Sequence, residues 1–214
     1  MMPLFNKGEF MSVDWNKVSY VLGQQIGSDF KEQGITVELE AFFSSFKDAF
    51  NGEPSNLTGP EMQEIMQSFQ VHMQAKQAEK SEKEGKLNLE EGTAFLAKNA
   101  SEDGIKTLES GLQYRVLNEG SGKTPTNTDT VEAHYEGKLL NGSVFDSSYQ
   151  RGQTIDFPVN GVIPGWTEAL QLMSEGSKWQ LFIPANLAYG EAGSPPVIPP
   201  NSTLLFDVEL VSVK

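Results

Sequence analysis

The first half of the chain carries apolar residues at helical spacing. Five of them mark a first segment: Val18, Val21, Leu22, Ile26 and Phe30. Because they recur every three or four residues, they fall on one face of an amphipathic helix. Gly34 follows this segment, and glycine is a common residue just beyond a helix end. The pattern therefore predicts a helix that ends near Gly34.

Two further helices are predicted before residue 100. The second is marked by Val37, Leu39, Phe42, Phe43, Phe46 and Phe50. A third begins near Pro60, since proline is well tolerated at a first helical position, where its missing N–H needs no partner. Its apolar stripe consists of Met62, Ile65, Met66, Phe69 and Met73.

The apolar stripe stops after residue 75, and residues 76–86 are almost wholly polar. Glu79 and Lys83, like Glu82 and Lys86, have the four-residue spacing of favourable helical ion pairs. We predict one long exposed helix from about Pro60 to near Asn99, in which Gly85 and Gly92 each cost roughly 1 kcal/mol. The expected organisation is a disordered N-terminus (1–13), a helical domain (14–75), a connector with a short link (76–110) and a C-terminal domain (111–214).

Three short helices cannot bury so much phenylalanine and methionine on their own. Pairing with a second copy of the chain would cover the surplus, which predicts a homodimer. The predicted interface residues are Phe42, Phe43, Phe46, Met62, Met66 and Phe69. The alternative is that these residues form a core within one chain.

From Gly111 onward the apolar period changes from helical spacing to two. Residues 131–139 alternate between apolar and polar positions, as expected for a half-buried strand, and Asn141-Gly142 is a strong tight-turn signal. Other strands are predicted at 112–117, near Phe145, at 178–183 and at 203–213, with one short helix at 168–173 that follows Trp166. About five antiparallel strands with a helix on one face make an α+β domain.

Large aromatic residues and one acid are spread over several of these strands and loops. They are Tyr135, Phe145, Asp146, Trp166, Tyr189 and Phe206. An apolar pocket with few polar groups suits an apolar ligand side chain better than acid–base chemistry.

Composition excludes several classes of function. The net charge is −13 and the sequence has no evident basic face, so nucleic acid is not an expected partner. There is no cysteine, and no run of about 18 apolar residues, so neither thiol chemistry nor a membrane span is expected. The first thirty residues do not form a secretory signal pattern, and we therefore expect a cytoplasmic location.

The usual catalytic groups are also scarce. The chain has two histidines, and His134 falls on the outward phase of its strand. No set of ligands is spaced for zinc, and no glycine-rich phosphate loop is present, so we expect neither metal nor cofactor. Hydrolysis by paired carboxylates is a weak alternative, because Asp146 is the one acid within an aromatic motif.

Residues 111–214 resemble the FKBP-type peptidyl-prolyl isomerases, which also bind rapamycin-like macrolides. The resemblance rests on five segments in this order: VEAHYEG at 131–137, GSVFDSS at 142–148, VIPGW at 162–166, LAYG at 187–190 and IPPNSTL at 198–204. With its helical first half, the chain looks like the Mip-type subgroup, named for the macrophage infectivity potentiator. That subgroup implies a V-shaped homodimer, with intertwined N-terminal helices and each catalytic domain on a long helical arm.

The resemblance also implies site residues. Asp146, Tyr189, Phe206 and Tyr135 would be the catalytic group. The substrate site would be lined by Tyr135, Phe145, Asp146, Arg151, Ile155, Val162, Ile163, Trp166, Tyr189, Ile198 and Phe206. Trp166 would be the floor beneath the proline ring, and Tyr189 would donate its hydroxyl to a substrate carbonyl. Ile155 stands where many members carry an aromatic residue, and Ser194 stands where a histidine is common.

Peptide-bond rotation fits such a pocket. The barrier of ∼18–20 kcal/mol arises from amide resonance, and the twisted midpoint loses the charge separation that water solvates. A dry, apolar pocket therefore favours the twisted amide over the planar one. The predicted function is X-Pro isomerisation in peptides and folding proteins, with helices that hold unfolded chains. The alternative is a holdase that binds peptides without catalysis.

Overall fold

The computed structural model describes residues 13–214, and the predicted disordered tail lies outside the described residues except for Val13. The chain divides into two compact units between Gln67 and Ser68. The boundary falls inside one unbroken helix, α3 (Gly59–Asn99). No helix within the described range is both long enough and apolar enough to cross a membrane.

The first unit is helical, as the spacing predicted. It contains α1 (Trp15–Glu32), α2 (Leu39–Phe50) and the start of α3. Gly34 has a left-handed φ of 66° just after α1, which favours glycine and ends the helix. At the start of α3, the backbone N–H of Thr58 donates to the Glu61 carboxylate at 2.8 Å, and Glu61 N–H donates to the Thr58 hydroxyl at 3.4 Å. This reciprocal pair is a capping box.

The apolar side chains of this unit are mostly uncovered. Phe42 is half-buried and packs edge-to-face on Phe30, with ring centroids 5.7 Å apart. Neither α1 nor α2 has a buried residue, and Phe43 and Phe50 are 60% and 82% exposed. A core within one chain therefore accounts for Phe42 but leaves most of the other apolar side chains in water.

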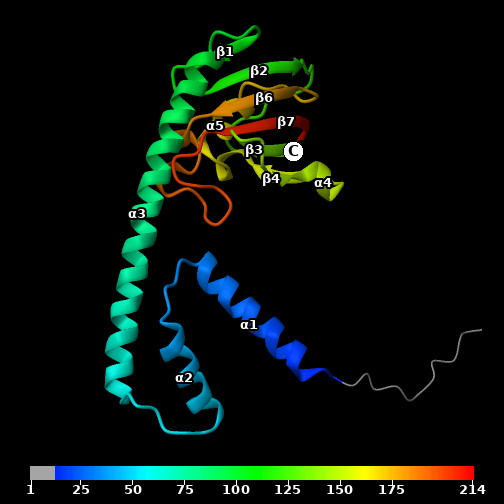
Figure 1. The fold of residues 1–214 in the computed structure, drawn as a ribbon. Helices are drawn as coiled ribbons and strands as arrows, with labels where there is room; N and C mark the ends of the chain where they lie inside the picture. Colours follow the sequence, from blue (N-terminus) through cyan, green and yellow to red (C-terminus); the bar gives the residue numbers. More distant parts are fainter. Residues whose placement is uncertain (1–12) are drawn as a thin grey trace, which may run out of the picture. The chain divides into compact units, whose positions relative to one another are not determined.

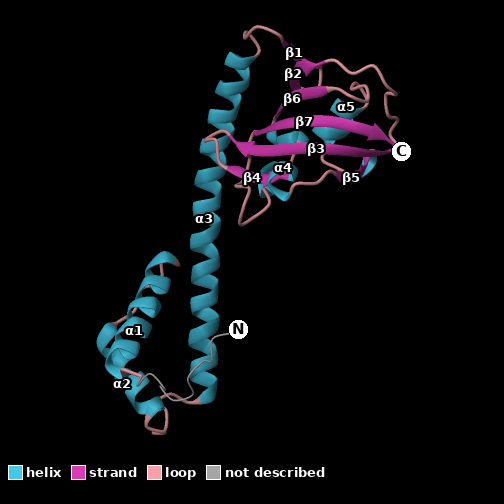
Figure 2. Ribbon diagram, turned by 90° about the vertical axis from the view of Figure 1, so that its right-hand side faces the viewer, coloured by secondary structure: helices cyan, strands magenta, loops and turns pink. Residues whose placement is uncertain are grey.

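The second unit is built on a seven-stranded antiparallel sheet, seen with α5 behind it in Figure 2. The strands lie in the order β1-β2-β6-β7-β3-β4, and β5 pairs with β3. Their bounds are β1 (Ile105–Thr107), β2 (Gln113–Asn118), β3 (Thr130–Leu139), β4 (Val144–Ser147), β5 (Ile155–Pro158), β6 (Lys178–Ile183) and β7 (Leu204–Val213). The α+β class is confirmed. β1 and β5 were not predicted, because three or four residues are too few to show alternation.

The hydrophobic core lies between the sheet and α5 (Pro164–Leu170). Leu170 and Ala169 of α5 pack with Leu181, Val208 and other buried strand residues. The helix begins four residues earlier than the predicted 168–173, because Pro164 occupies its first turn and presets the helical φ. Trp166 is therefore inside α5 rather than ahead of it. A second short helix, α4 (Ser148–Arg151), follows β4.

The second half of α3 is exposed at most positions, as the polar sequence predicted, but one face of it is docked. Gly85, Gly92 and Asn99 are buried against the sheet unit. Seven residues separate each from the next, so all three lie on one face of the helix. A Cβ on Gly92 would overlap the Thr203 hydroxyl, and one on Gly85 would lie 3.1 Å from the Pro200 Cβ. Gly85 and Gly92 are therefore sites of close packing. The contacts that α3 makes with the sheet unit offset the cost of these glycines in helix propensity.

Gly137 supplies a test of how tightly the sheet packs. A Cβ at this position in β3 would lie 2.6 Å from Phe145 Cζ and 2.7 Å from Phe206 Cε1. We expect Gly137→Ala to lower the free energy of unfolding of the sheet unit by about 1–3 kcal/mol, because both rings must move. Urea unfolding followed by near-ultraviolet circular dichroism measures this change. Val211→Thr, at an exposed position of β7, should change it by less than about 0.5 kcal/mol. Equal effects of the two substitutions would contradict the packing described.

Candidate active site

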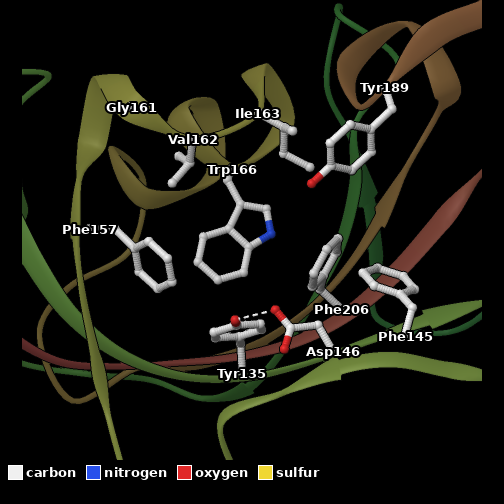
Figure 3. A pocket seen from close by; sticks show the side chains of 10 residues that line it. All are labelled: Tyr135, Phe145, Asp146, Phe157, Gly161, Val162, Ile163, Trp166, Tyr189 and Phe206. Carbon is white, nitrogen blue, oxygen red and sulfur yellow. Dashed lines mark hydrogen bonds between the residues drawn. The ribbon is translucent and has the colours of Figure 1, made fainter. Parts of the chain in front are cut away.

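A groove of about 410 Å³ opens beside α5 in the sheet unit, and Figure 3 shows the side chains around it. Ten residues line it: Tyr135, Phe145, Asp146, Phe157, Gly161, Val162, Ile163, Trp166, Tyr189 and Phe206. Most of them are aromatic or aliphatic. This volume falls within the range of sites that bind small ligands or single side chains.

Trp166 forms the floor of the groove and is 4% exposed. Three rings meet it edge-to-face: Phe206 of β7 at 5.3 Å between centroids, Tyr135 of β3 at 5.4 Å and Phe157 of β5 at 5.6 Å. Edge-to-face packing is directional, so these rings fix the plane of the indole. The helix that carries Trp166 and the three strands thus hold one flat apolar surface open to the groove.

The main polar group on the wall is Asp146, and both of its oxygens are engaged. The Tyr135 hydroxyl donates to Oδ2 at 2.5 Å, the bond drawn in Figure 3, and Arg151 Nη1 donates to Oδ1. Arg151 Nη2 also donates to the Tyr135 hydroxyl oxygen at 2.8 Å. The three side chains therefore form a closed hydrogen-bonded triangle.

This triangle fixes the charges of its members. Burial alone would raise the pKa of Asp146, but the hydrogen bonds from Tyr135 and Arg151 outweigh burial and hold that pKa below its ordinary value of 3.8. Burial and the adjacent carboxylate raise the pKa of Tyr135 above 10.0. At neutral pH Asp146 is thus ionised and Tyr135 is protonated, and neither is poised to exchange a proton.

Tyr189 stands at the rim, 42% exposed, with its hydroxyl directed over the groove. This hydroxyl has no hydrogen-bond partner among residues 13–214. It is therefore available to donate to a carbonyl oxygen of a bound ligand.

Eight of the eleven substrate residues implied by the resemblance lie on the groove. The other three do not. Arg151 hydrogen-bonds Asp146, whereas Ile155 and Ile198 pack in or against the hydrophobic core. Phe157 and Gly161 line the groove but were not predicted. Phe157 follows Ile155 by two residues on β5 and so faces the same side, a period-two signal that the four-residue strand was too short to reveal.

His134 lies outside the groove, as its outward phase predicted. Its ring stacks on Tyr149 with 4.7 Å between centroids, and Nδ1 is 3.0 Å from the Ser148 hydroxyl. Within the described part of the chain, no group of three or more His, Asp or Glu residues is placed to hold a metal ion.

Two family models match the chain. FKBP-type peptidyl-prolyl cis-trans isomerase matches residues 121–211, and the domain amino terminal to FKBP-type peptidyl-prolyl isomerase matches residues 15–116. The probable FKBP-type peptidyl-prolyl cis-trans isomerase FkpA of Neisseria meningitidis is 44% identical over 92% of this chain and 74% of its own length. Peptidyl-prolyl cis-trans isomerase Mip of Coxiella burnetii is 42% identical over 95% of this chain and 89% of its own length.

The fold matches a solved structure over nearly its whole length. The crystal structure of FkpA from Escherichia coli superposes with a TM-score of 0.76 at 41% identity, covering 95% of this chain and 98% of that one. The resemblance inferred from the five segments is therefore confirmed, as is the combination of N-terminal helices with a sheet domain.

The triangle around Asp146 gives a prediction about pH. A depressed carboxyl pKa stabilises the fold above the unfolded pKa of about 3.9, and this stabilisation is lost as pH falls through the lower folded pKa. Arg151→Met should therefore raise the pKa of Asp146 and lower stability more at pH 7 than at pH 3. Carbon-13 NMR titration of the carboxyl group and urea unfolding at both pH values measure the two effects.

Lys98→Met is the matched control, because it also removes one positive charge but lies on an exposed position of α3. It should leave the Asp146 pKa where it was. An unchanged pKa in Arg151→Met would show that the guanidinium does not hold the carboxylate.

Proposed function

The chain belongs to the FKBP-type peptidyl-prolyl cis-trans isomerases, and we propose that it turns X-Pro bonds over Trp166 as a homodimer whose helices hold unfolded clients. It is an isomerase that acts on proline-containing peptides and proteins. The observation that supports the proposed mechanism is the flat floor of Trp166, enclosed by aromatic rings, with a single free hydroxyl donor at the rim.

In this mechanism the proline ring of the substrate lies on the indole of Trp166. Its planar amide is resonance-stabilised, and water solvates the resulting charge separation well. The twisted amide loses that charge separation, so a groove lined by hydrocarbon disfavours the planar state more than the twisted one. Moving the amide from water into the groove therefore raises the energy of the planar state more than that of the twisted state. This lowers the barrier to rotation without any bond being made or broken.

Tyr189 adds orientation. Its hydroxyl lies over the groove and would donate to a substrate carbonyl next to the proline. Holding one side of the X-Pro bond while the ring rests on Trp166 orients the amide for rotation about that bond. Orienting a reactant in this way lowers the entropic part of the barrier.

Asp146 has a positioning role in this mechanism. Both of its oxygens already accept hydrogen bonds, and its pKa is lowered, so it is a poor proton acceptor and a poor nucleophile at neutral pH. This arrangement argues against hydrolysis through Asp146. By accepting from Tyr135, the carboxylate instead fixes the ring that packs on Trp166.

The helical unit supports the dimer and holdase parts of the proposal. Five of the six predicted interface residues on α2 and α3 are exposed apolar side chains: Phe43, Phe46, Met62, Met66 and Phe69. The sixth, Phe42, is half-buried and packs on Phe30 within its own chain. A second copy of the chain would cover this surface, and two linked pockets would raise the effective concentration of a client.

Two finer expectations stay predictions. The apolar groove would accept the proline-like ring of an FK506- or rapamycin-like macrolide, which competition with a tetrapeptide substrate would reveal. The cytoplasmic location is a prediction from the sequence, and fractionation of cells that express the chain would test it.

A first test distinguishes the contribution of Trp166 to catalysis from that of Tyr189. Trp166→Leu should lower kcat/KM for a proline tetrapeptide by more than about tenfold, because the flat support for the ring is lost. Tyr189→Phe should lower it about three- to tenfold, the usual effect of one hydrogen bond. Tyr149→Phe is the matched control, since that hydroxyl contacts Lys178 and Glu209 outside the groove.

These variants also separate the isomerase from a peptide-binding holdase. Client holding that persists in Trp166→Leu while isomerisation is lost would place the two functions in different parts of the chain. Full isomerase activity in both Trp166→Leu and Tyr189→Phe would show that the substrate does not bind in this groove.

A second test addresses the dimer. Met66→Glu should shift the chain toward monomers, because it places a charge in the proposed interface, while tetrapeptide turnover stays unchanged. Activity on a refolding protein limited by X-Pro bonds should fall. Sedimentation velocity and the two activity assays measure these effects.

Gln67→Glu adds the same charge on another face of α3 and should leave the solution mass unchanged. If Met66→Glu and Gln67→Glu have the same mass as the unmodified chain, the exposed residues of α3 do not form the interface.

A further inference from the structure

The second half of α3 carries an unusual contact face. It consists of small and amide residues: Gly85, Asn88, Gly92 and Asn99. Figures 1 and 2 both show this part of α3 lying along the sheet domain, and Gly85, Gly92 and Asn99 are buried there. Such residues bring the helix backbone close to its partner and supply hydrogen bonds, but they add little hydrophobic area.

The end of the helix is fixed to the sheet. Asn99 Nδ2 donates to Gln113 Oε1 at 2.9 Å, and Gln113 Nε2 donates to the Leu96 carbonyl at 2.9 Å. Phe95 packs on Phe182 of β6 with 5.9 Å between ring centroids. Because Gln113 begins β2, these contacts attach α3 to two adjacent strands of the sheet.

Earlier in α3, two hydrogen bonds hold the loop that leads into β7. Asn88 Nδ2 donates to the Pro200 carbonyl at 2.8 Å, and Asn201 Nδ2 donates to the Gly85 carbonyl at 3.2 Å. We refer to these four residues as the loop clamp. The missing Cβ of Gly85 permits the approach, since a Cβ there would lie 3.1 Å from that of Pro200.

One further hydrogen bond connects the loop clamp to the rim of the groove. Asn201 N–H donates to the Gly190 carbonyl at 2.9 Å, which joins the two ends of the loop, and Gly190 directly follows Tyr189. Asn201 has a left-handed φ of 55°, a conformation that asparagine tolerates better than most residues. Within the loop, Ser194 and Ile198 form a bridge, and Ile198 is buried in the core.

We infer that α3 is a positioning element of the prolyl groove, because the loop clamp fixes the loop that follows Tyr189 and so sets where its hydroxyl stands. This inference rests on the proposed placement of the substrate between Trp166 and Tyr189. In that placement Tyr189 holds a carbonyl next to the proline, so the residue before proline lies beside this loop. The loop clamp therefore determines turnover and the preference for that residue. Displacements of about 1 Å are enough to change the rate of an enzyme that acts by orientation.

A purely structural role makes a different prediction. If the loop clamp only stabilised the domain, its removal would lower the melting temperature, while the folded molecules would keep the same relative activity on every substrate. A positioning role changes the ratio of activities between substrates in fully folded protein.

The test uses the full chain with the paired substitutions Asn88→Ala and Asn201→Gly. They remove both hydrogen bonds to the loop, whereas glycine at 201 keeps the left-handed φ and the backbone bond to Gly190. The assay measures kcat and KM for tetrapeptides that differ only in the residue before proline. We expect kcat/KM for the preferred substrate to fall about three- to tenfold and the range across substrates to narrow. Hydrogen exchange in residues 190–203 should become faster.

Gln77→Ala is the control, because it replaces an exposed amide on the same helix before the docked face. It should leave kcat/KM, the substrate range and loop exchange unchanged. Unchanged kcat/KM and substrate range in the paired variant, with reduced activity in Tyr189→Phe, would overturn the inference and leave the groove mechanism standing. Full activity in Trp166→Leu and Tyr189→Phe would instead overturn the groove mechanism itself.

Discussion

The edge-to-face contact between Trp166 and its three neighbouring rings is the interaction on which the site depends. The rings come from β3, β5 and β7, and the indole comes from α5, so the groove exists only when helix and sheet are docked. Packing of this kind leaves little freedom to the indole plane. An apolar surface held rigid can favour a twisted amide, whereas a surface that adapts to its ligand would accommodate the planar amide equally well.

The polar groups near the groove serve the same purpose. Arg151 and Tyr135 occupy the oxygens of Asp146, and Asp146 in turn fixes the Tyr135 ring that contacts Trp166. A carboxylate without such partners would bind water in the groove and accept protons. Because its lone pairs are engaged and its pKa is lowered, Asp146 adds rigidity with little chemistry of its own. Of the two tyrosine hydroxyls on the groove, that of Tyr135 is engaged, whereas that of Tyr189 has no partner within the described residues.

The sequence predicted most elements but not how distant residues meet. Alternation over residues 131–139 was enough to identify β3, and helical spacing was enough for α1 and α2. Short β5 gave no period, so Phe157 was missed, and the resemblance placed its neighbour Ile155 on the groove. No spacing brings Tyr135, Trp166 and Phe206 together, because they lie far apart in the chain. Only the resemblance to a family did so, and it listed Arg151 among the lining residues, whereas Arg151 hydrogen-bonds Asp146 and is not part of the lining.

The second half of α3 shows why a polar helix is hard to interpret from sequence. Hydrophobic periodicity detects faces that bury hydrocarbon, and the face of Gly85, Asn88, Gly92 and Asn99 buries backbone and amides instead. Each glycine counts as a cost in helix propensity, and the compensating contact with Thr203 or Pro200 lies more than a hundred residues away. The seven-residue recurrence of small residues was nevertheless present in the sequence. In α3 this recurrence marks the docked face, which holds the loop beside Tyr189.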